Sequence, residues 1–196
     1  KMRIQLGKIK TSDLEVSLFS EEMSFEEAKL SFDKFKQLFA VVYDSDDLKN
    51  YVNAASPGDV FIVTDGTYND FESSFTSSGT ANNPIVIKAE TIGGVTLTGE
   101  SHFVFKKAAH IILEGFVFDA QDDNTLVKLE GCNNIRITRN VFELQTTDPI
   151  KWVYIGGVWD DNTFQHESHH NRIDHNTFQN KTTPSGISNP IQNFVF

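Results

Sequence analysis

The segment His166-Glu-Ser-His-His170 combines residue types and a spacing that could bind zinc. In zinc metallopeptidases, two histidines four positions apart on one helix face hold Zn²⁺, and the glutamate between them acts as general base. That chemistry requires a helix. Here the segment follows Asp160-Asp-Asn and runs directly into a predicted strand at Ile173. The spacing therefore indicates a zinc-dependent hydrolase only as the weakest hypothesis, with incidental surface metal binding as an alternative.

Two acidic segments and one cysteine are the other residues that could bind metal. Asp44–Asp47 and Asp122-Asp123 could attract Ca²⁺, but neither has the spacing of an EF-hand loop, and we interpret both as solvated turns. Cys132 is the single cysteine, so it can form neither an intramolecular disulfide nor an all-cysteine metal site. We interpret it as a small packed residue. The residues alone identify no metal ligands.

Length and charge exclude several classes of function. The chain has 196 residues, 17 Lys and Arg, 27 Asp and Glu, and a net charge of −10, a length typical of one domain. The acidic balance argues against binding nucleic acid through its phosphates. The apolar stretches are far shorter than the roughly 20 residues that cross a bilayer, so we expect no membrane partner. The first residues lack an apolar h-region, which predicts no signal peptide within this sequence.

Helical periodicity is confined to the first part of the chain. Residues 20–42 place apolar side chains at steps of three, four and seven, with Ser24 and Glu27 as a capping box, which predicts an amphipathic helix. A second short helix is predicted from Ser45 to Ala55, capped by Ser45 and ended by Pro57-Gly58. Residues 1–19 fit either a strand pair or a loose arm. We therefore divide one structural domain into an arm and helical cap, 1–56, and β coils, 57–196.

From Asp59 onward, short β segments alternate with Gly, Asn and Asp turns, without the helical runs that βαβ units need. Three segments superimpose as a repeat: Leu113-Glu-Gly-Phe-Val-Phe118, Ile137-Thr-Arg-Asn-Val-Phe142 and Ile173-Asp-His-Asn-Thr-Phe178. The offsets indicate one coil of about two dozen residues, with an excursion of about 12 residues in the second interval. Such a period predicts an all-β solenoid in which the aliphatic residues form one interior column and the phenylalanines another.

Two asparagines occur at the same place in the last two repeats. Asn140 and Asn176 each precede the repeat's phenylalanine by two residues. Asparagine tolerates the left-handed backbone region, and its amide can hydrogen-bond to the coil above or below. We interpret both residues as structural and expect them at the left-handed positions of the turns.

These residues also carry a family resemblance. The stretch Ala54-Ala-Ser-Pro-Gly-Asp-Val-Phe-Ile-Val-Thr-Asp-Gly-Thr-Tyr68, then Gly79–Glu90, Gly94–Gly99 and His110–Phe118, resembles the amino-terminal part of the chondroitinase B and alginate lyase family. Asn134–Phe142 and Asn171–Lys181 match its following coils, so the resemblance covers roughly residues 45–187. It implies a right-handed single-stranded parallel β-helix with an amino-terminal helical cap. It also implies a secreted or periplasmic protein that acts on uronic-acid polysaccharides such as alginate or dermatan sulfate.

The chemistry implied by the resemblance is β-elimination at a uronic acid. In the family, Ca²⁺ neutralises the carboxylate beside the C5 proton, a lysine serves as general base and an arginine assists. These groups lie on coils after the one represented by residues 171–181, and include a Glu-x-Glu segment that this sequence lacks. We therefore expect the family's catalytic coils to be absent. Catalytic residues and calcium ligands cannot be assigned, and Ca²⁺ is implied by resemblance alone.

Several residues could contact a sugar, because aromatic faces stack on sugar rings and arginine or lysine pairs with carboxylates. Those placed in the excursion between coils are Trp152, Tyr154, Trp159, Asp160, Asp161, His166, His169 and His170. Those on or beside coil strands are Arg139, Arg172, His175 and Lys181. Packing is the structural alternative for Trp152 and Tyr154, and a solvated outward position is the alternative for Arg139 and Arg172. Lys181 matches a family lysine that is not the catalytic one.

Three hypotheses follow from the sequence: a polysaccharide lyase, a non-catalytic β-helix that binds acidic polysaccharide or assembles with a partner, and the zinc hydrolase. Residues 187–196 do not resemble the family's next coil, and a β-helix that stopped there would leave unpaired backbone groups, which also predicts self-association through that open carboxy-terminal coil.

Overall fold

The computed structural model describes residues 9–11, 14–16, 39–52, 54–119, 125–143, 152–160 and 163–180. The chain divides into two compact units, Lys1–Leu38 and Phe39–Phe196. In the first unit, strands β1 (Ile9–Thr11) and β2 (Leu14–Val16) pair antiparallel. This matches the strand-pair alternative for residues 1–19. The described residues contain no helix long and apolar enough to cross a membrane.

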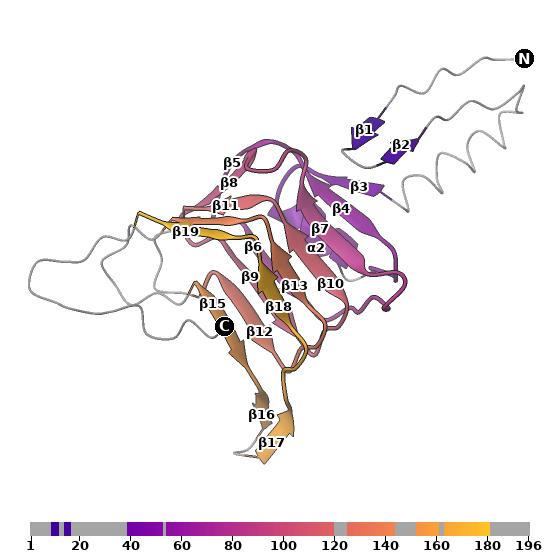
Figure 1. The fold of residues 1–196 in the computed structure, drawn as a ribbon, viewed down its shortest axis with the longest axis vertical. Helices are drawn as coiled ribbons and strands as arrows, with labels where there is room; N and C mark the ends of the chain where they lie inside the picture. Colours follow the sequence, from indigo (N-terminus) through magenta and orange to yellow (C-terminus); the bar gives the residue numbers. More distant parts are fainter. Residues whose placement is uncertain are drawn as a thin grey trace, which may run out of the picture. The chain divides into compact units, whose positions relative to one another are not determined.

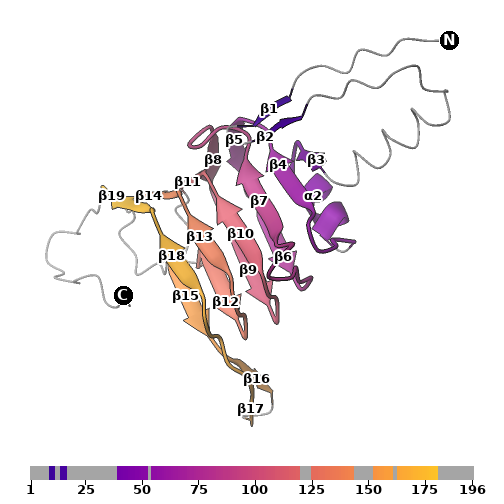
Figure 2. The same ribbon diagram turned by 45° about the vertical axis from the view of Figure 1, so that its right-hand side comes forward.

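In the second unit, the described strands wind into three parallel sheets, and successive strands of one coil belong to different sheets (Figures 1 and 2). The first sheet has the order β18-β13-β10-β7-β4-β3, the second β19-β14-β11-β8-β5 and the third β15-β12-β9-β6. This is a parallel β-solenoid, so the predicted all-β class and coil are confirmed.

The strands are short and of similar length in all three sheets. The first sheet consists of β3 Phe39–Val42, β4 Val60–Val63, β7 Ile85–Ala89, β10 Ile111–Glu114, β13 Arg136–Thr138 and β18 Arg172–Asp174. The second consists of β5 Gly66–Asn69, β8 Val95–Thr98, β11 Phe116–Phe118, β14 Val141–Glu143 and β19 Thr177–Gln179. The third consists of β6 Glu72–Phe75, β9 His102–Lys106, β12 Val127–Glu130 and β15 Val153–Gly156.

The interior columns follow the predicted repeat. Leu113 pairs with Ile137 and Ile137 with Ile173 across the first sheet. In the second sheet, the rings of Phe118 and Phe142 stack with centroids 4.8 Å apart, and Phe142 and Phe178 repeat that distance. The spacing equals the distance between neighbouring strands, so each ring lies directly over the next. Burial of these columns stabilises coils that could not bury an apolar face alone.

The asparagines form a ladder at the turn from the first sheet to the second, in which Asn140 is buried and Asn176 is half-buried. Asn140 Oδ1 accepts from the Phe116 amide at 2.9 Å, and Asn176 Oδ1 accepts from the Asn140 amide at 2.9 Å. Their structural role is confirmed, but the expected backbone position is wrong by one residue. The positive φ angles belong to Arg139 (54°) and His175 (55°), which aim the following asparagine inward.

The helical prediction is correct in one place and wrong in another. Helix α2 spans Ser45–Val52, with Leu48 buried in the core. Asp44, rather than Ser45, caps it, since Asp44 Oδ1 accepts from the Asp47 amide at 2.8 Å. The first acidic segment is therefore a helix start and not a solvated turn. Residues 39–42, predicted as helix, form β3 and pair with β4, because sheet pairing outweighs local periodicity there. The rest of the predicted helix lies outside the described residues.

A hairpin interrupts the coils between β15 and β18. Its strands, β16 (Val158–Asp160) and β17 (Thr163–His166), pair antiparallel, and it lies within the predicted excursion. Trp152 and Tyr154 were expected in that excursion, but they belong to the coil. Tyr154 lies in β15, and Trp152 packs against the hydrophobic core just before it.

Candidate functional site

The zinc interpretation fails on local structure. His166 ends strand β17, and His169 and His170 lie in the connection to β18 rather than on a helix. Ser168, within the motif, donates to the Gly156 carbonyl at 2.6 Å and accepts from the Cys132 amide at 2.9 Å. The motif is thus a strand end tied to the preceding coil, and it cannot place two histidines on one helix face.

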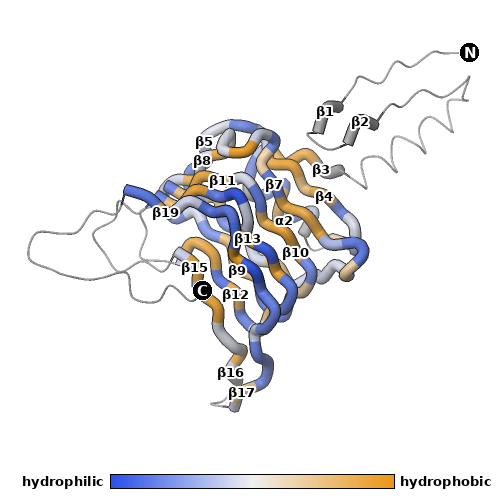
Figure 3. Tube along the Cα trace, viewed as in Figure 1, coloured by the Kyte–Doolittle hydropathy of each residue, from blue (hydrophilic) through white to orange (hydrophobic). Residues whose placement is uncertain are grey.

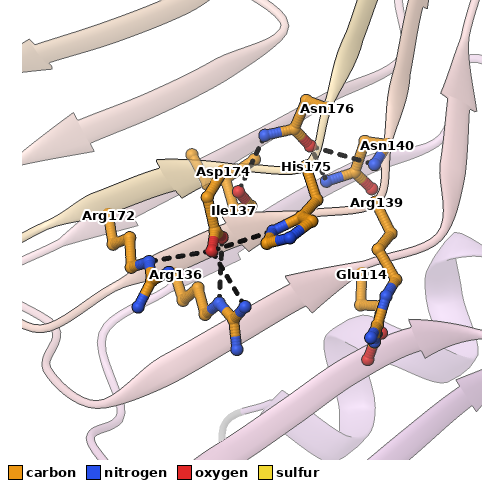
Figure 4. Close-up of polar contacts among 9 residues, drawn as sticks. All are labelled: Glu114, Arg136, Ile137, Arg139, Asn140, Arg172, Asp174, His175 and Asn176. Atoms are coloured by element: carbon orange, nitrogen blue, oxygen red, sulfur yellow. Dashed lines mark hydrogen bonds and ion pairs between the residues drawn. The ribbon is translucent and has the colours of Figure 1, made fainter. Parts of the chain in front are cut away.

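A charged network lies on the outward face of the first sheet, on β13 and β18 (Figure 4). Arg136 donates to Asp174 through Nε and Nη2, both at 2.9 Å, in a bidentate pair. Arg172 Nε lies 2.8 Å and His175 Nδ1 3.1 Å from Asp174 Oδ2. Arg136 and Arg172 are register partners on adjacent strands. One carboxylate therefore orients two guanidinium groups on neighbouring coils.

The network shifts the acid–base equilibrium of its central carboxyl. Hydrogen bonds from Arg136 hold the pKa of Asp174 well below its usual range, and His175 acts in the same direction against the opposing effect of burial. The same pairing raises the pKa of Arg136. Asp174 is therefore an anion at any physiological pH, and it serves to position arginines rather than to exchange protons.

Arg139 extends this surface along the turn that follows β13. It forms an ion pair with Glu114 of β10, and about half of its side chain is exposed. Arg139 and His175 occupy corresponding places in successive turns, each with φ near 55°. We call Arg136, Arg139 and Arg172 the arginine face. Three guanidinium groups and one imidazole lie there against the carboxylates of Glu114 and Asp174.

The earlier coils differ at the same turn. Asp65 and Glu90 follow β4 and β7, and the Asp65 amide donates to Glu90 Oε2 at 3.2 Å. The turn between the first and second sheets thus carries Asp65 and Glu90 in the early coils, and Arg139 and His175 in the late ones. Figure 3 shows that β7 is mainly apolar, whereas β13 and β18 contain polar stretches. Cations concentrate locally, although the chain is acidic as a whole.

The structure brings together only some of the predicted sugar-contact residues. Arg139, Arg172 and His175 lie on one surface, whereas Tyr154 is on the third sheet and Trp159 is on the hairpin. Lys181 and Asp161 lie outside the described residues. Sequence reasoning missed Arg136 and Asp174. The repeat offset of 36 residues could have found Arg136, which occupies the same place before Ile137 that Arg172 occupies before Ile173.

The three sheets, the asparagine ladder and the stacked phenylalanines define the class of the protein, a parallel β-helix with a charged outward face. Residues 42–189 match the chondroitinase B family, which is more than half of the chain, and the protein belongs to that family. No curated protein matches the chain.

Solved structures agree with this assignment. The PL6 family alginate lyase AlyGC is 27% identical, with a TM-score of 0.59 over 72% of this chain and 19% of AlyGC, and a mutant of AlyGC gives the same values. A mannuronic acid specific polysaccharide family 6 lyase from human gut microbiota is 24% identical, with a TM-score of 0.55 over 73% of this chain and 34% of that one. The likeness to the mannuronic acid specific lyase shows the fold alone. The chain thus spans less than half the length of either lyase.

Proposed function

We propose that this protein is a polysaccharide lyase-type β-helix that binds uronic-acid polysaccharides, such as alginate or dermatan sulfate, on its arginine face. The observation that carries the proposal is the position of Arg172, whose side chain is 66% exposed on β18. Among the described residues, the Arg172 guanidinium pairs only with Asp174, through Nε. Its two terminal nitrogens can therefore bind a carboxylate in the bidentate geometry that arginine favours.

The surrounding groups support binding of a polymer rather than of a single acid. Arg136 and Arg172 lie on adjacent strands, about 4.8 Å apart along the coil axis. Arg139 lies three residues further along the same coil as Arg136. An acidic chain laid across these strands would meet guanidinium groups on more than one coil. Asp174 and Glu114 hold those guanidinium groups in place, so less side-chain conformational entropy is lost when a polymer binds.

Titration of the 196-residue chain with alginate and dermatan sulfate at several salt concentrations tests the proposal. We expect salt-sensitive binding of both polymers and none of neutral dextran. Arg172→Ala and Arg139→Ala should each weaken binding about tenfold, the order expected for one charge-assisted contact. Lys106→Ala removes an exposed cation from the third sheet and should leave affinity unchanged. Equal weakening by all three variants would contradict a site on the arginine face.

Cleavage by calcium-assisted β-elimination is the second candidate, supported by membership of the family and by the alginate lyase AlyGC. The described residues do not fit a calcium site. No group of three or more His, Cys, Asp or Glu among them could hold a metal, and Glu114 and Asp174 already pair with arginines. We therefore derive no step through calcium. Ultraviolet absorbance of unsaturated product, with calcium and with chelator, tests this candidate directly.

Further expectations belong to the same proposal: right-handed winding, an amino-terminal helical cap, secretion or a periplasmic location, and self-association. The last has support from the described end of the coils, where Ile155 is 44% and Ile173 38% exposed. Exposed apolar side chains on coil strands favour pairing with another chain. Light scattering across a dilution series should show a concentration-dependent mass, and a constant monomer would contradict self-association.

A further inference from the structure

The hairpin formed by β16 and β17 projects past the end of β15 in both ribbon views (Figures 1 and 2). Its two largest side chains are exposed, Trp159 at 66% and Phe164 at 48%. Their ring centroids lie 5.2 Å apart, with planes inclined by 64°. An exposed aromatic pair on a projecting element is informative, because burial of such rings is strongly favourable when a partner is present.

A β-bulge sets the cross-strand partner of Trp159. Val158 pairs with His166, and the register shifts between Val158 and Trp159. Without that shift, Trp159 would oppose Gln165. With it, Trp159 lies opposite Phe164, while Val158 stays buried. Bulges redirect side chains at the cost of local ladder hydrogen bonds, and they occur frequently beside functional sites.

Gly157 makes room for the supporting ring. A Cβ atom at Gly157 would collide with the edge of the Phe164 ring, so only glycine allows that ring to lie against the hairpin backbone. Phe164 is thereby held by the backbone on one side and contacts Trp159 on the other. The Trp159 indole is therefore held in position by Phe164, and most of its surface is exposed to water.

The hairpin is also tied to the coil that bears the arginine face. The His169 amide and the Asn171 Nδ2 group both donate to the Cys132 carbonyl at 3.0 Å. Asn171 Oδ1 accepts from the Ile135 amide at 3.0 Å. The next residue is Arg172, the first of β18. These bonds fix the return from the hairpin immediately before the arginine face begins.

Stabilisation of the hairpin is the structural alternative for the ring pair, since cross-strand aromatic pairs stabilise two-stranded ribbons. That role accounts for Phe164, which fills the space at Gly157. It does not account for Trp159, whose exposure is greater than that of its partner. We propose that Trp159, supported by Phe164, is a stacking platform for a pyranose ring of the acidic polysaccharide. This inference rests on the proposed function.

Tryptophan fluorescence tests the platform directly, because the chain has two tryptophans. In a Trp152→Phe background, Trp159 is the single reporter. Saturating alginate hexasaccharide should shift its emission to shorter wavelength and reduce acrylamide quenching several-fold. Full hexasaccharide binding by calorimetry without any change in Trp159 emission or quenching would overturn the inference.

Substitutions separate stacking from charge pairing. Trp159→Leu keeps an apolar strand residue but removes the flat ring, and should weaken alginate hexasaccharide binding about tenfold without changing its salt dependence. Trp159→Phe should retain most of the affinity. Tyr43→Ala, at an exposed aromatic residue before α2, should have no effect and is the matched control.

The outcomes distinguish this inference from the proposed function. If Trp159→Leu is neutral while Arg172→Ala weakens binding, the platform is wrong and the arginine face stands. The reverse result upholds the platform and contradicts the arginine face. Wild-type protein that binds no alginate hexasaccharide contradicts both. Amide hydrogen exchange of β16 and β17 in Trp159→Leu should match wild type, which shows that the hairpin is still folded. If it does not match, the affinity of Trp159→Phe and the fluorescence of Trp159 decide whether the platform stands.

Discussion

The inside and the outside of the same coils follow different rules. Within the first sheet, the inward column reads Leu113, Ile137, Ile173, whereas the outward column beside it changes from Ile112 to Arg136 and Arg172. Both columns are produced by one hydrogen-bonded register. Register therefore copies positions from coil to coil, and only burial forces residue types to repeat. Outward positions are not under that constraint, and in the late coils charged side chains occupy them.

Burial of the interior column differs between the middle coils and the last described coil. Leu113 and Ile137 are fully buried, but Ile173 is 38% exposed in the last described coil, although all three share one column. A column residue is buried only when coils cover it on both sides. Substitutions in the middle should therefore affect stability most, substitutions at the end less, and substitutions on the arginine face least.

The largest effect is expected at the centre of the phenylalanine stack. Phe142→Ala removes a fully buried ring that stacks on two neighbours, and should lower the free energy of unfolding by about 3–5 kcal/mol. Phe178→Ala, at a partly buried ring that stacks on Phe142, should cost clearly less. Urea denaturation of both variants measures the difference. Equal losses would contradict the contrast between middle and end.

The asparagine ladder should show the next largest effect. Asn140→Ala leaves the Phe116 amide and the Leu113 carbonyl without the partner that now bonds to each, at 2.9 and 3.2 Å. Burying unsatisfied groups of this kind should cost about 2–3 kcal/mol. Asn83→Ala, at an exposed asparagine, should change stability by less than about 0.5 kcal/mol and is the control. A loss at Asn140 as small as at Asn83 would exclude a stabilising ladder.

The interior can be predicted from the sequence because it repeats. The steps from Leu113 to Ile137 and from Phe118 to Phe142 correspond to register partners in the first and second sheets. The turn is harder to predict, because an asparagine in a repeat suggests the left-handed position, whereas the structure uses Arg139 for it and turns Asn140 inward. Residue type alone does not distinguish the two roles.

The outward site can be predicted only in part. Residue type makes Arg172 and His175 candidates, but their shared partner Asp174 depends on contacts across coils that no local pattern reveals. Trp159 is a candidate as well, but its pairing with Phe164 depends on a single bulge. Strand β3 was missed because a phenylalanine spacing that fits a helix is overruled by pairing with β4.

A moderate effect is expected from Asp174. Its pKa is lower in the folded protein than the ordinary value of about 3.9, so its ion pairs stabilise the fold at pH above that value. The contribution should disappear as the pH falls from about 5 through the lowered pKa. Asp174→Asn should cost about 1 kcal/mol at pH 7, because the partner arginines are partly exposed. The stability difference from wild type should shrink in acid, and a constant difference would contradict the assignment.

The smallest effect on stability, and the sharpest test of the contrast, is expected from Arg172→Ala. Arg172 is 66% exposed and contributes one bond to Asp174, whereas Arg136 contributes two and chiefly sets the pKa of that carboxyl. Arg172→Ala should therefore change the free energy of unfolding by less than about 0.5 kcal/mol and leave the pKa of Asp174 low, while Arg136→Ala raises it. Carboxyl titration by NMR measures that pKa in both variants. Because Arg172→Ala should still weaken polyuronate binding about tenfold, loss of affinity together with a normal Asp174 pKa would mean that Arg172 positions the network rather than contacts the polymer.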